Sequence, residues 1–454
     1  MTTWQVGHEF TMEVTGLTHE GAGVGRVEDR VVFVPEALPG DLIRLKLVHF
    51  KERLAYGELV EILHASPDRV QPWCPHAANC GGCQLQHLSY DAQLRWKQQQ
   101  VQDALERIGK LNGEVLPTLG MEEPFQYRNK AQFPLGLASG EVIMGFFKKG
   151  THEIVNLEEC RIQHPLLTKL ALALKDTVRK LGIEPYDEKQ HLGVLRHGVI
   201  RVSFSQEKVM LILVTRTSDL PKQDELIAEL TKTVPELVSL AHNVNSSVTN
   251  VIFGRETEVI WGQPNLIDSI GQVNYAISPG SFFQVNPLQT KVLYDLVRER
   301  LDLTGHETVL DLYCGAGTIG LYVASEAKQI IGVETFAPAI ADAKCNAQLN
   351  GITNAEFLVG KAEEELPKLL KKQITIDGVI LDPPRKGCDR SLLETLVRAQ
   401  VPKIVYVSCN PSTLARDLSY LNQHGYDVGS VQPVDMFPWT RHVEAIVLMS
   451  KNKV

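Results

Sequence analysis

The sequence predicts an α/β protein in which a doubly wound domain follows a small β-barrel and a central domain of α+β type. Three observations support this fold class. Short alternating strands broken by glycines fill residues 1–63, and residues 120–275 mix strand and helix patterns without a strong motif. From about Pro279 onwards, apolar strands alternate with helical patterns, which is typical of a mostly parallel sheet. We therefore expect three domains, at residues 1–63, 64–278 and 279–454.

The first segment contains four strand-like runs, with turns expected at 21–25 and 39–40. The runs are residues 11–15, 30–34, 41–48 and 58–63. So many strands in so short a segment favour a closed barrel. The pattern GxGxGR followed by VFVPxALPGD, in residues 21–41, resembles the TRAM domain, an RNA-binding barrel attached to RNA-modifying enzymes.

A helix is expected over residues 89–110, after a cysteine-rich connector at 72–87. Leu94, Val101 and Leu105 share its apolar face by their spacing, and Ser89 is a suitable N-cap. This helix could pack on the third domain. In that domain, strands are expected at residues 308–313, 329–334, 356–359, 376–381, 403–408 and 443–449.

Composition restricts the classes of function. The formal net charge is −8, the wrong sign for a chain that binds nucleic acid by bulk electrostatics, so RNA binding must depend on local sites. The N-terminus has no basic run followed by an apolar stretch, and no window of 18 apolar residues is present. We expect a cytoplasmic protein with no membrane partner and no obligate protein partner.

Residues 308–320 read as a buried strand that enters a glycine-rich turn and then a helix. Gly315, Gly317 and Gly320 satisfy GxGxxG, and Glu334 follows 19 residues after Gly315, a spacing that also suits a dinucleotide cofactor. Two details favour S-adenosylmethionine instead: Asp311 at the strand end could meet a cationic ligand, and the LDPPR stretch at 381–385 resembles the fourth-strand motif of methyltransferases.

Cys409 ends a hydrophobic strand in the stretch KIVYVSCNPSTL, and Glu444 opens the final apolar run. Carbon 5 of uracil is a weak nucleophile, and addition of a thiolate at carbon 6 creates the electron density that methyl transfer requires. A base must then remove the carbon 5 proton. Glu444 is the candidate base, and His442 competes for this role.

Four motifs together resemble the RNA uracil-5-methyltransferase family: SPGSFFQVN at 278–286, DLYCGAGT at 311–318, LDPPRKG at 381–387 and VYVSCNPSTLARD at 405–417, followed by HVE at 442–444. The resemblance covers nearly the whole chain. It implies a Rossmann-like class I methyltransferase domain, Cys409 as nucleophile and Glu444 as general base. It also implies S-adenosylmethionine contacts from Gln284, Tyr313, Gly315, Gly317, Thr318, Glu334 and Asp382, and substrate contacts from Phe282, Phe283 and Arg385.

Cys74, Cys80, Cys83 and Cys160 offer four thiolates, and their spacing alone leaves zinc and an iron–sulfur cluster equally open. The spacing resembles the [4Fe–4S] site of the ribosomal branch of the family, which makes zinc the less favoured occupant.

The resemblance implies 23S ribosomal RNA as the substrate, because transfer-RNA relatives usually lack both the barrel and the cysteines. The alternatives are uracil-5-methylation of transfer RNA, cytosine-5 methylation, and a non-catalytic RNA-binding factor of ribosome assembly.

Overall fold

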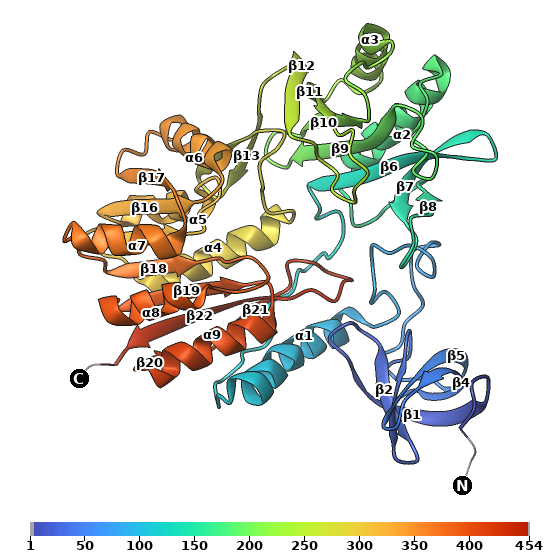
Figure 1. Ribbon diagram of the computed structural model, residues 1–454, viewed down its shortest axis with the longest axis horizontal. Helices are drawn as coiled ribbons and strands as arrows, with labels where there is room; N and C mark the ends of the chain where they lie inside the picture. The colour runs from blue at the N-terminus through green and yellow to red at the C-terminus, as the bar shows by residue number, and fades with distance from the viewer. Residues whose placement is uncertain (1–3, 453–454) are drawn as a thin grey trace.

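The computed structural model describes residues 4–452 and shows a barrel, a central sheet domain and a larger α/β domain (Figure 1). The outermost residues of the two terminal domains expected from the sequence, 1–3 and 453–454, lie outside the described residues. In the described part, no helix is long and apolar enough to cross a membrane.

Five strands close into the N-terminal barrel, in the order β1-β2-β3-β5-β4. They are β1 (Glu9–Leu17), β2 (Gly23–Val27), β3 (Arg30–Val34), β4 (Leu42–Phe50) and β5 (Leu54–His64). The turn expected at 21–25 is wrong for most of its length, because Gly23 and Gly25 lie in β2. A Cβ atom on Gly25 would lie 2.4 Å from the Glu13 carbonyl oxygen, so this glycine allows close strand contact.

The connector helix α1 (Tyr90–Ala104) continues into a π-helical turn, η1 (Leu105–Gly109), and packs against the α/β domain. Ser89 occupies the N-cap position, but its side chain makes no capping hydrogen bond. Lys97 and Asp435 are both fully buried and lie 2.6 Å apart between Nζ and Oδ1. This ion pair ties the connector to the segment that precedes the last strand.

The central domain is a seven-stranded sheet in the order β12-β11-β10-β9-β6-β7-β8. Helix α2 packs on β6, β7 and β9, and α3 packs on α2 and β11, so both helices cover one face. The elements are β6 (Lys130–Ala138), β7 (Glu141–Phe147), β8 (Ile154–Asn156), α2 (Pro165–Leu181), β9 (Leu195–Ser203), β10 (Lys208–Thr215), α3 (Gln223–Thr233), β11 (Leu237–Val244) and β12 (Glu256–Gly262). Val199, Met210 and Ile212 on the other face join a core cluster of the α/β domain.

The α/β domain is built on a sheet ordered β17-β16-β15-β18-β19-β22-β20, with β21 paired to β22. Its strands are β15 (Thr308–Leu312), β16 (Gln329–Glu334), β17 (Ala355–Val359), β18 (Gly378–Leu381), β19 (Lys403–Ser408), β20 (Tyr426–Val428), β21 (Gln432–Val434) and β22 (Glu444–Lys451). The helices are α4 (Pro287–Leu301), α5 (Thr318–Val323), η2 (Ala324–Glu326), α6 (Ala337–Leu349), α7 (Ala362–Lys371), α8 (Arg390–Ala399) and α9 (Pro411–Gln423). A hairpin of β13 (Leu266–Ile270) and β14 (Val273–Ile277) precedes α4.

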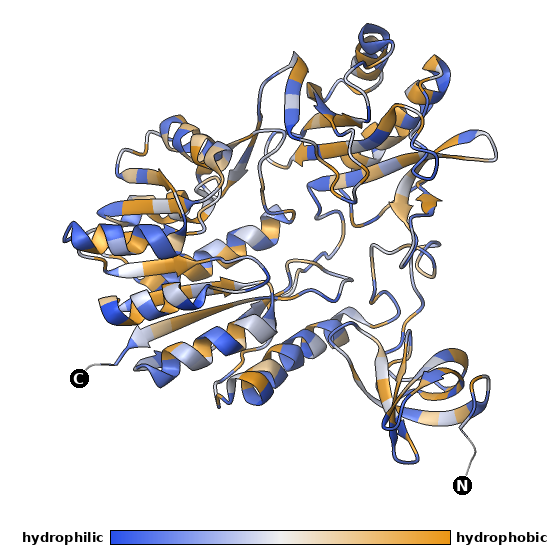
Figure 2. Cartoon of the chain, viewed as in Figure 1, coloured by the Kyte–Doolittle hydropathy of each residue, from blue (hydrophilic) through white to orange (hydrophobic). Residues whose placement is uncertain are grey.

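The strand order reverses between β15 and β18, since β16 and β17 extend one way and β18 and β19 the other. The strands are parallel from β17 to β19, whereas β22 is antiparallel to β19. Figure 2 shows hydrophobic strands between helices of mixed hydropathy. In such sheets, ligands bind beyond the carboxyl ends of the strands at the reversal. The fold therefore directs attention to the loops after β15, β16, β18 and β19.

Candidate active site and cysteine pocket

The loop after β15 turns sharply because three of its residues adopt left-handed backbone conformations. Tyr313, Gly315 and Gly317 have φ angles of 73°, 53° and 76°. The Gly320 amide donates a hydrogen bond of 2.8 Å to Oδ2 of Asp311. A Cβ atom on Gly320 would lie 2.9 Å from the same oxygen, so glycine is required for this contact. The turn thus holds its backbone at the edge of the sheet with one carboxylate oxygen.

Acidic side chains gather at this edge. Burial, with the nearby charges of Asp382 and Glu334, raises the pKa of Asp311 to about 7, and its Oδ1 atom is buried without a hydrogen-bond partner in the described part of the chain. Burial likewise raises the pKa of Asp382, after β18, to about 7. Glu334 ends β16 and accepts 2.9 Å hydrogen bonds from the Thr335 hydroxyl and the Phe336 amide. Together these three carboxyl groups form an acidic edge of the sheet, which favours a cationic ligand.

Strand register brings Cys409 and Glu444 together. In the antiparallel pair of β19 and β22, Ser408 lies opposite Ala445. Cys409 follows Ser408 and Glu444 precedes Ala445, so the two side chains belong to neighbouring strand ends. The Glu444 charge acts on the pKa of the Cys409 thiol, which agrees with their proximity. A thiol and a carboxyl group therefore meet beside Asp382, at the end of the adjacent strand β18.

The pKa values of both groups are raised, which favours the protonated thiol and the protonated carboxyl group. Burial raises the pKa of Cys409 to about 11, with further upward contributions from the charges of Glu444 and Asp382. Burial also raises the pKa of Glu444 well above its usual range. Arg385 opposes both shifts, because its positive charge stabilises the thiolate and the carboxylate.

His442 lies beside this cluster, and its Nδ1 atom is 3.2 Å from the Arg385 guanidinium. Burial, together with the charge of Arg385, lowers the pKa of His442 to about 4. The Arg385 loop is fixed to the Cys409 loop, since Asn410 donates a 3.0 Å hydrogen bond to the Arg385 carbonyl oxygen.

The segment 278–286 separates its two phenylalanines. Phe282 is 71% exposed, whereas Phe283 is 5% exposed and packs 5.7 Å from Tyr275 between ring centroids. The ring of Phe283 belongs to the core, so Phe282 is the exposed one of the two candidates for substrate contact. The carbonyl oxygen of Gln284 accepts a 2.9 Å hydrogen bond from the Asn129 side chain.

Two further predicted cofactor residues make protein contacts. The Tyr294 hydroxyl donates a 2.8 Å hydrogen bond to the Thr318 hydroxyl at the start of α5. The side chain of Tyr313 is half-buried next to Cys388, and burial raises the pKa of its phenol. Both residues border the turn after β15.

Arg201 and Asn129 were missed by the sequence analysis. Arg201, on β9 of the central sheet, is 3% exposed and donates hydrogen bonds to the carbonyl oxygens of Pro279 and Ser281. Asn129 binds the backbone of the same segment at Gln284 and at Val285. The central domain thus binds the segment that carries Phe282 and Gln284 through hydrogen bonds. The only available sequence signal was one arginine inside an apolar strand.

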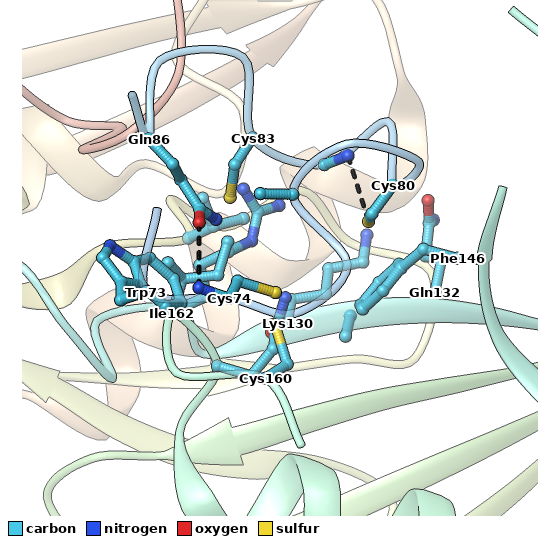
Figure 3. Close-up of a pocket in the computed structure, with 16 residues that line it drawn as sticks. Trp73, Cys74, Cys80, Cys83, Gln86, Lys130, Gln132, Phe146, Cys160 and Ile162 are labelled. Atoms are coloured by element: carbon cyan, nitrogen blue, oxygen red, sulfur yellow. Dashed lines mark hydrogen bonds between the residues drawn. The ribbon is translucent and has the colours of Figure 1, made fainter. Parts of the chain in front are cut away.

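The four predicted metal ligands line one cavity of about 380 Å³ between the connector and the central domain (Figure 3). Cys74, Cys80 and Cys83 enter from the connector loop, and Cys160 enters from the central domain. Gly81 donates a 2.9 Å hydrogen bond to the Phe147 carbonyl oxygen, which fixes the loop to the end of β7.

The thiols of this cavity are not assembled as a metal site. Among residues 4–452, no group of three or more His, Cys, Asp or Glu side chains is arranged to hold a metal ion. Burial, with the charges of the other cysteines, raises the pKa of Cys83 to about 12, and burial raises that of Cys160 to about 11. All four cysteines are free thiols.

Comparisons with known proteins cover nearly the whole chain. Residues 89–452 match the family model tRNA (Uracil-5-)-methyltransferase, and residues 3–60 match the TRAM domain. An uncharacterized RNA methyltransferase from Halalkalibacterium halodurans is 50% identical over 446 residues, which are 98% of this chain and 97% of that protein. Another from Clostridium tetani is 45% identical over 441 residues, covering 97% and 96%.

One solved structure is similar over its full length. The crystal structure of Pyrococcus abyssi tRNA (uracil-54, C5)-methyltransferase in complex with S-adenosyl-L-homocysteine superposes with a TM-score of 0.77 at 29% identity. The match covers 97% of this chain and 100% of that one.

Proposed function

The chain belongs to the tRNA (uracil-5-)-methyltransferase family, and we propose that it methylates carbon 5 of a uridine in 23S ribosomal RNA through a covalent adduct on Cys409. The membership confirms the resemblance drawn from the sequence motifs. The family model, the relatives and the structure solved with S-adenosyl-L-homocysteine all support a broader description of the activity. The chain is an S-adenosylmethionine-dependent RNA uracil-5-methyltransferase with a TRAM barrel.

The observation that supports the mechanism is the meeting of Cys409 and Glu444 at neighbouring strand ends. The Cys409 thiolate adds to carbon 6, and the electrons of the carbon 5–carbon 6 double bond form an enolate. S-adenosylmethionine, when bound, supplies the methyl group that carbon 5 takes up. Glu444 then removes the carbon 5 proton, the double bond re-forms and the thiolate leaves.

The raised pKa values of Cys409 and Glu444 make this chemistry conditional on ligand binding. In the free protein the raised pKa values favour the protonated form of both groups. A positive charge bound at the acidic edge would lower the pKa of Cys409 and of Glu444, as the charge of Arg385 already does. The nucleophile and the base are therefore activated together, when both ligands are in place.

The carboxyl groups at the acidic edge suit S-adenosylmethionine as a ligand. The unpartnered Oδ1 atom of Asp311 and the raised pKa of Asp382 call for a cationic or donating ligand. In the proposal, Glu334 holds the ribose hydroxyls, whereas Gln284, Tyr313 and the Gly315–Gly317 backbone hold the amino-acid part. Asp382 and Thr318 complete the set.

The target uridine must leave its stack, because carbon 5 and carbon 6 both have to reach protein groups. Phe282 is an exposed ring in the segment 278–286, and in the proposal it occupies the gap or stacks against the extruded base. Arg385, which faces the thiol and the carboxyl group, would contact the uracil ring.

The choice between two RNA substrates depends on different observations. The TRAM barrel together with four cysteines in one cavity supports 23S ribosomal RNA, by resemblance to the ribosomal branch. The structural similarity to a tRNA (uracil-54, C5)-methyltransferase favours transfer RNA as the second candidate.

Release of tritium from carbon 5 tests the proposal. Transcripts of 23S ribosomal RNA and of transfer RNA, labelled with 5-tritiated uridine, are incubated with the protein and S-adenosylmethionine. Release from the 23S transcript is expected. Release from transfer RNA alone would replace the substrate, and binding without release from either would favour a non-catalytic assembly factor. A cytidine-labelled transcript tests the cytosine-5 alternative.

The same proposal assigns a [4Fe–4S] cluster to Cys74, Cys80, Cys83 and Cys160. Their four thiols face one cavity, and a set of four thiols suits iron–sulfur clusters and zinc. When bound, the cluster supplies a cross-link between connector and central domain. Iron and sulfide analysis of anaerobically purified protein tests the assignment, and stoichiometric zinc in colourless protein would contradict it.

A further inference from the structure

A second cavity, of about 940 Å³, lies on the central sheet and is separate from both sites described above. We call it the central-sheet pocket. Its walls include Pro134, Ile143, Phe147 and Ile154 from the strands β6 to β8, and Tyr186 from the segment before β9. Its volume falls in the range of sites that enclose most of a small-molecule ligand, about 300–1,000 Å³. It is therefore large enough for one or two nucleobases.

Sheet register places this pocket on the face that the α/β domain partly covers. On β9, Arg201, Val199 and His197 alternate along one face, opposite Lys130, Gln132 and Pro134 of β6. Arg201 grips the segment 278–286, Val199 joins the core shared with the α/β domain, and His197 lines the pocket. Four residues of strand separate Arg201 from His197, roughly 13 Å. The pocket thus lies on the same face of the central sheet as Arg201, which binds the segment 278–286.

The pocket carries an unsatisfied polar group. His197 Nδ1 is buried and has no hydrogen-bond partner in the described part of the chain. Burial, with the charge of Arg196, lowers the pKa of His197 to about 4, so its ring is neutral and offers one donor and one acceptor nitrogen. A neutral imidazole can exchange a single hydrogen bond with a polar group of a nucleobase.

Flat side chains line the same pocket. The rings of Phe147 and His152 stack with centroids 5.1 Å apart and planes 22° apart. The Arg196 guanidinium lies 4.7 Å from the centroid of the Tyr186 ring, so this ring is supported from one side. Aromatic rings of this kind are the platforms on which proteins stack unpaired bases.

The charges around the pocket argue against a phosphate ligand. Three basic residues, Lys148, Lys189 and Arg196, are balanced by three acidic ones, Glu153, Asp187 and Glu188. Lys148 is already paired with Glu153 at 2.6 Å, and His152 with Glu188 at 2.8 Å. A site for the RNA backbone would carry an excess of positive charge. The lining suits an uncharged, flat group.

We propose that the central-sheet pocket binds one or two unpaired bases of the substrate RNA, at nucleotides that flank the target uridine. The inference rests on the proposed function, since it takes the RNA as the ligand. Binding here would hold the RNA at two points of one surface, the extruded uridine in the active site and a second unpaired base on the central sheet. The pocket would then contribute to the choice of RNA and not to the chemistry.

Photocrosslinking tests where the RNA lies. Transcripts of 23S ribosomal RNA and of transfer RNA, substituted with 4-thiouridine, are irradiated with the Cys409→Ala variant. That variant isolates binding from methyl transfer, so failure of the covalent mechanism leaves this test intact. Crosslinks to peptides within residues 134–154 or 185–197 are expected. Crosslinks confined to the peptides that contain Phe282 or position 409 would overturn the proposal.

A binding measurement gives the second arm. In the same background, Phe147→Ala combined with His197→Leu should weaken binding of the crosslinking transcript at least about fivefold, because a stacking platform is lost. Trp261→Ala, an exposed aromatic on the far edge strand β12 of the same sheet, is the matched control and should bind as its parent does. Equal affinity of the pocket variant and the control would overturn the proposal. So would a fivefold loss that persists on a transcript from which the unpaired nucleotides flanking the target uridine have been removed.

Discussion

The active-site edge and the cysteine pocket differ in how their reactive groups are held. At the active-site edge, Cys409 and Glu444 stand at the ends of paired strands, so the sheet register alone brings them together. In the cysteine pocket, three thiols come from a connector loop and one from another domain, and within the described residues they form no metal-ready group.

This difference shows which of the two sets of side chains the fold positions in the absence of a ligand. Backbone hydrogen bonds of a sheet position side chains whatever their charge state. Loop cysteines with pKa values of about 11 or 12 must lose protons before they can bind metal, so their assembly depends on the metal itself. The proposed catalytic pair is therefore preorganised, whereas the proposed cluster site would be completed only on binding.

The largest expected effect concerns the pair formed by Cys409 and Glu444. Glu444→Gln keeps the size of a side chain that is only 5% exposed but removes the base. We expect kcat for methylation to fall about 10²–10⁴-fold, with accumulation of the RNA adduct. His442→Gln serves as the control and should change kcat far less. A larger loss in the histidine variant would reassign the base.

Next in size is the loss of the buried ion pair that supports the active-site edge from the connector. Lys97→Met leaves the buried Asp435 carboxylate without its cation, and we expect a cost of about 3–5 kcal/mol in the free energy of unfolding. Arg95→Met on the same helix breaks an exposed pair with Asp68 and should change stability little. Denaturant unfolding measures both, and equal destabilisation would show that α1 does not anchor through Lys97.

Removal of one proposed cluster ligand tests the account of the cysteine pocket. Cys83→Ser should abolish iron retention and lower the melting temperature of the anaerobically purified protein, while Cys345→Ser, at an exposed cysteine on α6, should change neither. After removal of iron by a chelator, the wild type and Cys83→Ser should melt together. A difference that remains would mean that Cys83 stabilises the fold without metal.

A further prediction concerns the pH dependence of stability. The pKa of Asp382 is raised from 3.8 to about 7 in the folded protein, so its contribution to stability is fully present below about pH 4 and is lost as the pH rises through about 7. Asp382→Asn removes this dependence. The melting temperature of the variant minus that of the wild type should therefore increase from pH 4 to pH 7 and then level off. A difference that decreases over this range would contradict the raised pKa.

Much of this architecture could be predicted from the sequence, because its signals are local. The glycine turn after β15, the strand that ends in Ser408-Cys409 and the DPPR stretch each depend on neighbouring residues. Apolar runs likewise located six strands of the α/β sheet to within a few residues, whereas the three-residue strands β20 and β21 were missed.

What could not be predicted depends on contacts between distant segments. Phe282 and Phe283 are adjacent and chemically identical, and only packing against Tyr275 decides which ring is buried. Arg201 donates hydrogen bonds to carbonyl oxygens that lie 78 and 80 positions later in the chain. No local sequence pattern predicts such contacts. Gly25 was read as a turn residue because a close approach between strands leaves no local signal.

The most direct test uses RNA with 5-fluorouridine at the target position. The base cannot remove fluorine as it removes a proton, so the adduct on the nucleophile should persist through denaturing electrophoresis. We predict a trapped complex for the wild type, with the RNA attached to the peptide that contains Cys409, and none for Cys409→Ser. Undiminished trapping in Cys409→Ser, or attachment at another cysteine, would contradict the account.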